Sequence, residues 1–220
     1  CVRDTLLGRT PGDWDITTSA KPEEVKEIFG KTVDTGLKHG TVTIIKHGSG
    51  YEVTTYRIDG EYLDGRHPET VEFTPDLRED LKRRDFTINA LAISLNQENY
   101  GVLIDPFGGS QHLEERLNKT PLDPGLTFSD DPLRMMRAIR FASQLNFQIE
   151  ENTFQAIAEY RHRLPIVSME RIMDEFNKIM LSPEPSRGIR LLDEGGLLEI
   201  FFPELTALKG VERVQGVKQK

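Results

Sequence analysis

The spacing of hydrophobic and polar positions changes about half-way along the chain, which indicates two kinds of structure in succession. In residues 40–59, β-branched side chains dominate both sides of the Gly-Ser-Gly at 48–50, so the pattern predicts two strands joined by a turn. A short helix is predicted at 21–30, because glutamates follow its proline and a glycine ends it. A segment at 76–95 that turns from charged to apolar, and a strand entering a turn at 102–109, complete a mixed α/β half.

The second half is predicted to be helical throughout. After residue 122, β-branched runs are few and apolar positions recur every three to four residues. We therefore expect an α+β fold with a mixed head over residues 1–122, an all-helical neck over residues 123–220, and a natural chain that continues beyond residue 220. The helices expected in the neck span 131–145, 150–162, 168–181, 185–195 and 197–201.

Composition and charge narrow the class of protein. The chain has 220 residues, of which 37% are hydrophobic and 29% charged, as is usual for a globular protein. No apolar run approaches the roughly 20 residues that span a bilayer, and a single cysteine cannot form an internal disulfide, so we expect a cytoplasmic protein with no membrane partner. The net charge of −8 argues against a protein that simply coats nucleic acid, although arginines gather in 81–85 and 134–140.

The stretch PGDWDITT, residues 11–18, is the first candidate for chemistry, because it places two carboxylates beside a turn. If residues 13–17 are extended, Asp13 and Asp15 point to the same face, about 6–7 Å apart, where both can bind hard cations. Glu52, on the second arm of the predicted hairpin, is the candidate third carboxylate. Such acids hold the two ions of metal-assisted phosphoryl transfer, but acid pairs also occur by chance in chains of this length.

Several segments occur in the order found in one enzyme family. The first is LLGRTPGDWDITT, which closely resembles the signature of polymerase-β-superfamily nucleotidyltransferases, in the branch of class II tRNA nucleotidyltransferases (CCA-adding enzymes) and bacterial poly(A) polymerases. The resemblance implies a polymerase-β-type head, a helical neck, two Mg²⁺ ions, and transfer from CTP and ATP to a tRNA 3′ end. The family commonly has an Asp where this chain has His112. Later motifs of the family are matched by KRRDFTINALA, DPFGG, DDPLRMMRAIRFA and ERIMDEFNKIM, so the resemblance covers nearly the whole chain.

A second group of candidate residues lies in RRDFTINA. The guanidinium of Arg84 has a fork of donors that suits a triphosphate, and Asp85 and Asn89 can accept from and donate to sugar hydroxyls. The resemblance likewise implies that Asp85 and Asn89 bind the ribose, and that Arg3 binds phosphates together with Arg84. Without the other motifs, a solvated helix end with a surface Arg–Asp ion pair would be the simpler explanation.

The arginines of DDPLRMMRAIR form a third group. On a helix, Arg134, Arg137 and Arg140 fall on one broad face, and Asp131 lies one turn before Arg134. One explanation is an i, i+3 ion pair beside a solvated basic stripe. In the other, Asp131 and Arg134 read a base. Cytosine and adenine both present an amino donor beside ring acceptors, so one such unit can accept CTP and ATP. The resemblance implies this choice, with Arg137 and Arg140 assisting nucleotide binding. The opposite face of the helix is predicted to be apolar, with Met135, Met136 and Ile139.

The polar segment 59–73 has no clear periodicity and is predicted to be a mobile loop. In CCA-adding members of the family, a loop near this place helps the site to switch from C to A addition. Asp64 and Arg66 make this segment similar to the complete form, and an ordinary surface loop is the alternative. We therefore expect a CCA-adding enzyme. The rivals are a poly(A) polymerase, a partial CC- or A-adding enzyme, and a non-catalytic RNA-binding module that retains the fold.

Overall fold

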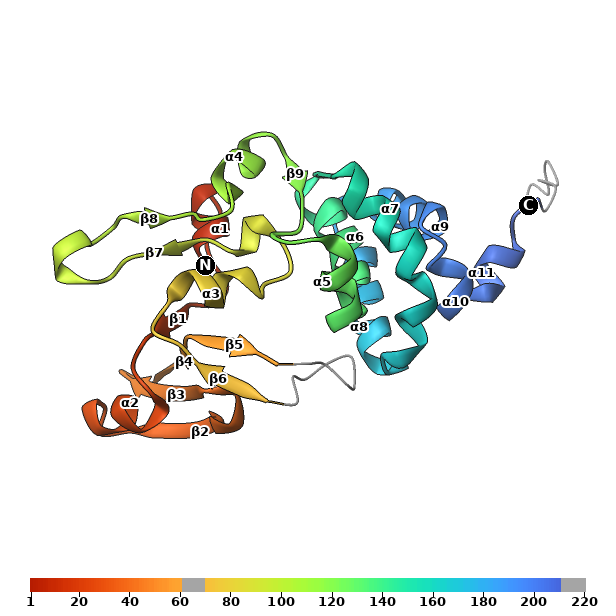
Figure 1. The fold of residues 1–220 in the computed structure, drawn as a ribbon. Helices are drawn as coiled ribbons and strands as arrows, with labels where there is room; N and C mark the ends of the chain where they lie inside the picture. Colours follow the sequence, from red (N-terminus) through yellow and green to blue (C-terminus); the bar gives the residue numbers. More distant parts are fainter. Residues whose placement is uncertain (61–69, 211–220) are drawn as a thin grey trace, which may run out of the picture.

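The computed structural model describes residues 1–60 and 70–210, and it confirms the α+β class (Figure 1). Its largest sheet has the strand order β1–β4–β3–β2, in which β1 runs parallel to β4 and the other neighbours are antiparallel. The parallel pair brings the PGDWDITT segment alongside the predicted hairpin. The strands are β1 (Asp15–Thr18), β2 (Thr32–Gly36), β3 (Thr41–Lys46) and β4 (Ser49–Thr55).

The turn between β3 and β4 is tighter than the predicted Gly-Ser-Gly turn at 48–50. Lys46 pairs with Ser49, so the loop consists of only His47 and Gly48. Both have positive φ angles, 52° and 80°, which is the backbone of the two-residue turn that matches the twist of a hairpin. The prediction of two strands was right, and the placement of the turn was wrong by one residue because His47 adopts a conformation that the sequence pattern assigns to glycine.

Short elements make up the rest of the head, and the β7–β8 hairpin extends away from the neck (Figure 1). The predicted loop 59–73 is bounded by paired strands, since β5 and β6 form an antiparallel ladder from Arg57–Phe73 to Asp59–Val71. The helices are α1 (Val2–Leu6), α2 (Pro22–Ile28), α3 (Leu77–Lys82) and α4 (Gly109–Glu114), with 3-10 turns η1 (Leu37–His39), η2 (Thr87–Asn89) and η3 (Gln97–Asn99). The strands are β5 (Arg57–Asp59), β6 (Val71–Phe73), β7 (Ala92–Ile93), β8 (Leu103–Ile104) and β9 (Leu117–Asn118).

The neck contains each of the five predicted helices, and it begins with one that the pattern did not predict. Helix α5 lies in 122–132, where Asp123 accepts a hydrogen bond from the Leu126 amide and Pro124 occupies the first turn. No helix within the described ranges is long and apolar enough to cross a membrane. The neck elements are α5 (Pro124–Asp130), α6 (Leu133–Leu145), β10 (Gln148–Ile149), α7 (Glu151–Tyr160), η4 (Arg161–Ile166), α8 (Met169–Met180), α9 (Pro185–Glu194), α10 (Leu198–Phe201) and α11 (Pro203–Ala207).

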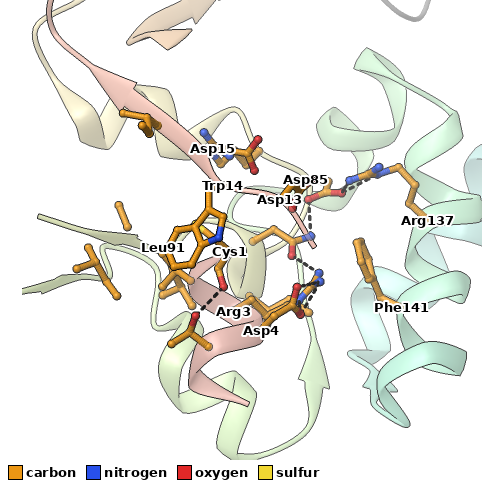
Figure 2. Close-up of a pocket in the computed structure, with 18 of the residues that line it drawn as sticks. Cys1, Arg3, Asp4, Asp13, Trp14, Asp15, Asp85, Leu91, Arg137 and Phe141 are labelled. Carbon is orange, nitrogen blue, oxygen red and sulfur yellow. Dashed lines mark hydrogen bonds and ion pairs between the residues drawn. The ribbon is translucent and has the colours of Figure 1, made fainter. Parts of the chain in front are cut away.

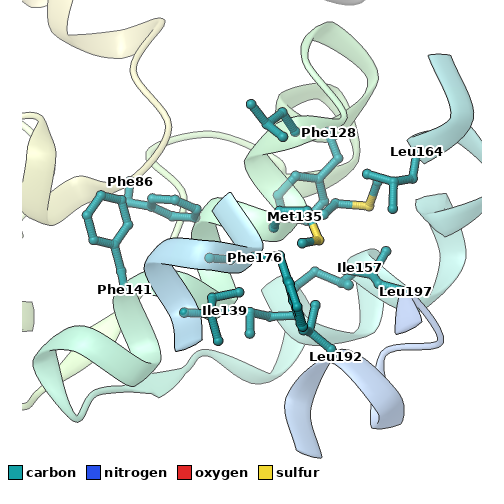
Figure 3. Close-up of a cluster of buried hydrophobic side chains, with 14 of the residues drawn as sticks. Phe86, Phe128, Met135, Ile139, Phe141, Ile157, Leu164, Phe176, Leu192 and Leu197 are labelled. Atoms are coloured by element: carbon teal, nitrogen blue, oxygen red, sulfur yellow. The ribbon is translucent and has the colours of Figure 1, made fainter. Parts of the chain in front are cut away.

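Two hydrophobic cores of unequal size hold these elements together. The small one joins Val25 of α2 to Ile44 and Val53 of the sheet. The large one runs from Phe86 to Phe201, with α6 at its centre (Figure 3). The residues between α3 and α5 therefore pack on the neck, and side chains on both sides of residue 122 share one core. The α6 pattern is confirmed: its fully buried side chains include Met135, Met136 and Ile139, while its arginines are only partly exposed.

The DPFGG turn joins the head to this core through backbone contacts. The carboxylate of Asp105 accepts hydrogen bonds from the amides of Gly109 (2.7 Å) and Ser110 (2.9 Å), which starts α4. His112, where the family commonly has Asp, lies 2.9 Å from the Thr87 hydroxyl through its Nδ1 atom. A Cβ on Gly109 would overlap the carbonyl oxygen of Thr87. The glycine therefore allows α4 to lie against η2, which carries Asn89.

We predict that Gly109→Ala lowers the free energy of unfolding by about 1–3 kcal/mol, because the backbone of Thr87 must shift to accommodate the methyl group. Urea denaturation of the variant measures the change. Gly30→Ala is the matched control, because a Cβ at Gly30 meets no atom within 4 Å. An equal loss in both variants would show that close packing at Gly109 is not the cause.

Candidate active site

A cavity of about 780 Å³ lies where α1, the start of β1, the segment after α3, and the neck helices α6 and α8 meet (Figure 2). Arginines outnumber aspartates along its wall, although the whole chain is acidic. Clustered guanidinium groups favour anionic ligands, and phosphate in particular, because each offers a planar fork of donors. The arginines that line the cavity are Arg3, Arg83, Arg84, Arg134, Arg137, Arg140 and Arg171.

Two carboxylates of the cavity have no partner among the described residues. Asp13 and Asp15 are exposed, and their side chains form no hydrogen bond or ion pair there. The other aspartates of the wall are paired, for example Asp4 with Arg3 at 2.8 Å. Free carboxylates next to an arginine-rich wall suit a hard cation, which prefers oxygen ligands. The donor set therefore fits Mg²⁺.

Glu52 lies beside Asp15 but does not line the cavity. The two residues are paired in register across β4 and β1, and Glu52 is exposed and free of partners within the described part of the chain. The strand β1 begins at Asp15, so Asp13 precedes the paired part of the segment. In residues 1–60 and 70–210, no group of three or more acidic, histidine or cysteine side chains is arranged to hold a metal. The three carboxylates are thus neighbours in the fold without converging on one point.

Asp85 forms the centre of a buried polar network. Its Oδ2 accepts from Nε (2.8 Å) and Nη2 (2.6 Å) of Arg137, and its Oδ1 accepts from the Asn89 side-chain amide at 3.0 Å (Figure 2). Asn89 in turn accepts from Arg3 at 2.8 Å. Burial alone would raise the pKa of Asp85, but the charge of Arg137 and the hydrogen bonds from Asn89 and Arg137 outweigh it, so the pKa lies below its ordinary value. Asp85 is therefore ionised at neutral pH and orients both neighbours. The surface ion pair considered for these residues was wrong.

Asp131 and Arg134 do not pair with each other, which removes the i, i+3 explanation. Asp131 accepts from the Leu133 amide at 3.1 Å and from Arg171 of α8 at 3.2 Å. Arg134 instead donates to two backbone carbonyls, those of Thr127 (3.4 Å) and Arg83 (3.0 Å). Each side chain is thus fixed separately at the cavity wall, and each keeps hydrogen-bonding capacity for a ligand.

The third arginine of α6 is held by α8. The Nε atom of Arg140 lies 2.6 Å from the buried carboxylate of Glu175, and its guanidinium stacks over the Phe141 ring at 4.2 Å. Burial lowers the pKa of Arg140 below its ordinary value although Glu175 opposes the shift, and the group remains charged at neutral pH. The guanidinium groups of Arg3 and Arg137 also lie over this ring, 5.0 Å and 5.5 Å from its centroid. Phe141 therefore contacts three cavity arginines through cation–π interactions.

Ten of the residues predicted for the site line the cavity, and other lining residues had no predicted role, among them two arginines and two aromatic residues. Arg83 and Arg171 line the cavity although no role was predicted for them. Both lie in segments that were singled out, KRRDFTINALA and ERIMDEFNKIM, so their charge was the available signal. Trp14 and Phe141 had no such signal, because an aromatic side chain in these patterns is equally consistent with the core. Asp64 and Arg66 lie outside the described residues.

A mixed head with free carboxylates and clustered arginines, followed by a helical neck, is the arrangement of a nucleotidyltransferase. Residues 1–119 match the family model described as "Poly A polymerase head domain", and residues 146–209 match "Probable RNA and SrmB- binding site of polymerase A". The chain therefore belongs to the class II tRNA nucleotidyltransferase and bacterial poly(A) polymerase family, which confirms the resemblance found in its motifs.

Several proteins that this chain is similar to are CCA-adding enzymes. The enzyme of Anoxybacillus flavithermus is 50% identical over 208 residues, which are 94% of this chain and 51% of that protein. The crystal structure of the Bacillus stearothermophilus enzyme in complex with CTP has a TM-score of 0.80 and 46% identity, covering 89% of this chain and 46% of that one. The Thermotoga maritima enzyme complexed with tRNA has a TM-score of 0.72 and 33% identity, with 92% and 47% covered. The chain spans about half the length of these relatives.

Proposed function

We propose that this chain is the nucleotide-binding part of an enzyme that adds cytidine, cytidine and adenosine to the 3′ end of tRNA, using CTP and ATP and releasing pyrophosphate. The observation that carries the proposal is the cavity in which Asp13 and Asp15 are unpaired beside clustered arginines. The names of relatives at about 50% identity support CCA addition over poly(A) synthesis. These substrates also support a cytoplasmic location.

Asp13 and Asp15 would hold Mg²⁺, with Glu52 as an additional carboxylate at the edge of the site. When bound, two such ions activate an RNA 3′-hydroxyl and neutralise the charge of the triphosphate and of the departing pyrophosphate. Within residues 1–60 and 70–210, neither aspartate has a hydrogen-bond or ion-pair partner, so both side chains are available to a ligand.

The arginines and the Asp85 network would bind the sugar and phosphates. Arg84 is one-third exposed and lines the cavity, so its guanidinium can reach the triphosphate, and Arg3 lines the same cavity. Asn89 is held by both Arg3 and Asp85, which fixes its amide for a ribose hydroxyl. Asp85 then acts at the ribose mainly by orienting Asn89 and Arg137. Positions set in this way before binding reduce the entropy lost when the nucleotide is ordered.

Base choice would depend on Asp131 and Arg134, with Arg137 and Arg140 behind them. Cytosine presents an N4 amino donor next to N3, and adenine presents an N6 amino donor next to N1. A carboxylate accepts from the amino group while a guanidinium donates to the ring nitrogen. Uracil and guanine have a carbonyl oxygen and an N–H in those places. The carboxylate would then face another acceptor and the guanidinium another donor, so neither hydrogen bond could form.

The test is extension of a tRNA that ends at the discriminator base. The protein with its full natural chain is incubated with this tRNA, Mg²⁺, CTP and ATP, and the 3′ ends are sequenced. We expect products that stop at CCA. A ladder of adenosines would assign poly(A) polymerase activity instead, and products ending at CC would show that the 59–73 segment does not support the switch to adenosine. No extension at all would favour the non-catalytic module.

A further inference from the structure

A buried carboxylate outside the cavity holds two of the cavity arginines. Asp80 of α3 has no exposed surface. Its Oδ1 accepts from Nε (3.1 Å) and Nη2 (3.0 Å) of Arg83, and its Oδ2 accepts from Nη2 of Arg84 at 3.3 Å. Oδ1 also accepts from the backbone amide of Arg57 at 3.2 Å, which ties α3 to β5. A buried carboxylate with this many charged donors orients each of them strongly.

Asp80 is also connected to Arg134, which is proposed to contact the base, through the backbone of Arg83. Arg83 follows α3 directly, and its carbonyl oxygen accepts from Nη2 of Arg134 at 3.0 Å. The Arg83 side chain is held at its other end by Asp59, whose carboxylate lies 3.4 Å away. Because Arg83 is fixed by Asp80 and Asp59, its carbonyl is a rigid acceptor. Asp80 is therefore linked to Arg134 through the backbone of Arg83, while Arg134 is also held by the Thr127 carbonyl.

We propose that Asp80 is a positioning residue that sets the placement of the phosphate-binding Arg84 relative to the base-reading Arg134. The inference rests on the proposed function, and it adds a residue that affects nucleotide choice from outside the nucleotide site. A nucleotide must contact both arginines at once, and a misplacement of about 1 Å between binding groups can cost about 100-fold in rate. One carboxylate that holds both sides of the site keeps their separation constant.

The charge arrangement explains why a carboxylate is needed at this position. Arg83 and Arg84 are neighbours in the chain and Arg134 approaches Arg83, so three cations share one end of the cavity. Asp80 contacts two of these guanidinium groups from the buried side, which leaves their outer surfaces available. An amide at the same place would turn an NH₂ group toward arginine donors, and at least one arginine would move.

The experiment measures nucleotide choice in Asp80→Asn with the full natural chain. We compare kcat/KM for CTP with that for UTP, and ATP with GTP, on tRNA primers that accept each. We expect each ratio to fall about tenfold, the size of one lost hydrogen bond to a charged group. The KM values for CTP and ATP should also rise. Arg134→Ala provides the reference for full loss of base reading.

The matched control is Glu79→Gln, which removes the same charge from the next residue of α3. Glu79 is partly exposed and pairs only with Lys82, at 3.4 Å, among the described residues. Its ratios should match the wild type. Equal changes in both variants would mean that net charge is responsible and would overturn the proposal. So would an Asp80→Asn enzyme that loses activity equally with all four nucleotides, because this is the result of a purely structural role.

A second variant keeps the proposal testable if Asp80→Asn does not fold. Arg83→Lys retains a cation next to Asp80 but removes the planar guanidinium that donates to Asp80 through Nε and Nη2 and approaches Asp59 through Nη1, and the Arg83 side chain is partly exposed. We expect a smaller loss of selectivity in the same direction, and unchanged ratios in the folded variant would overturn the proposal. A wild-type protein without any transfer activity would instead contradict the proposed function, so the two failures are distinct.

Discussion

Asp13→Ala is expected to reduce nucleotide transfer by about 1,000-fold or more, which corresponds to about 4 kcal/mol of lost transition-state stabilisation. The large effect follows from the position of the carboxylate: it faces the cavity and has no partner among the described residues, so it is available to a ligand. The fold should be unaffected for the same reason. Single-turnover extension of tRNA at several Mg²⁺ concentrations measures the loss, and binding of CTP to the variant should remain close to that of the wild type.

Asp34→Ala is the control for removal of one exposed carboxylate. Asp34 lies in β2, away from the cavity, where it pairs with Lys26 at 2.9 Å. An exposed ion pair of this kind contributes about 0–1 kcal/mol, so both stability and transfer should be nearly unchanged. If Asp13→Ala transferred nucleotides as fast as Asp34→Ala, the assignment of Asp13 to the metal site would be wrong. Asp15→Ala should behave as Asp13→Ala does.

Arg137→Met is expected to lower the free energy of unfolding by about 3–5 kcal/mol at pH 7, because it leaves the buried Asp85 without its main countercharge. Urea denaturation of the variant and the wild type gives this difference. Lys178→Met is the control, since Lys178 is half exposed and its ion pair with Glu175 is long, at 3.3 Å. The double variant Asp85→Asn with Arg137→Met should recover part of the loss, because the amide needs no countercharge.

The same pair predicts a pH dependence with a defined sign. In the wild type the pKa of Asp85 lies below its ordinary value of 3.8, so its contribution to stability is complete above pH 3.8 and is lost as pH falls toward the lower, folded value. Without Arg137, burial dominates and raises that pKa above the unfolded value, so protonation on acidification stabilises the variant. The stability difference between wild type and variant should therefore be smaller at pH 4 than at pH 7. A difference that grows on acidification would contradict this account.

Local pattern was enough to predict the class of the fold and to name candidate residues for the site. The period of α6 placed arginines on one face and methionines on the other, and β-branched runs predicted the β3–β4 hairpin. Such patterns report on a single element, since the side chains of one helix or strand face the same neighbour. Carboxylates and arginines in family motifs then indicated the chemistry, because few residue types can bind metal ions and triphosphates.

The pairing of those residues was decided by the tertiary structure. Asp131 pairs with Arg171 rather than with Arg134, and Asp85 pairs with Arg137, 52 positions away in sequence. Neither choice can be read from spacing, because it depends on how α8 and the segment after α3 pack against α6. The left-handed backbone of His47 and the contact of the Arg83 carbonyl with Arg134 are likewise set by how separate segments pair and pack. The sequence alone was enough to name candidate groups for nucleotide binding. Packing between distant segments decided which of them are neutralised inside the protein and which, as at Asp13 and Asp15, stay free.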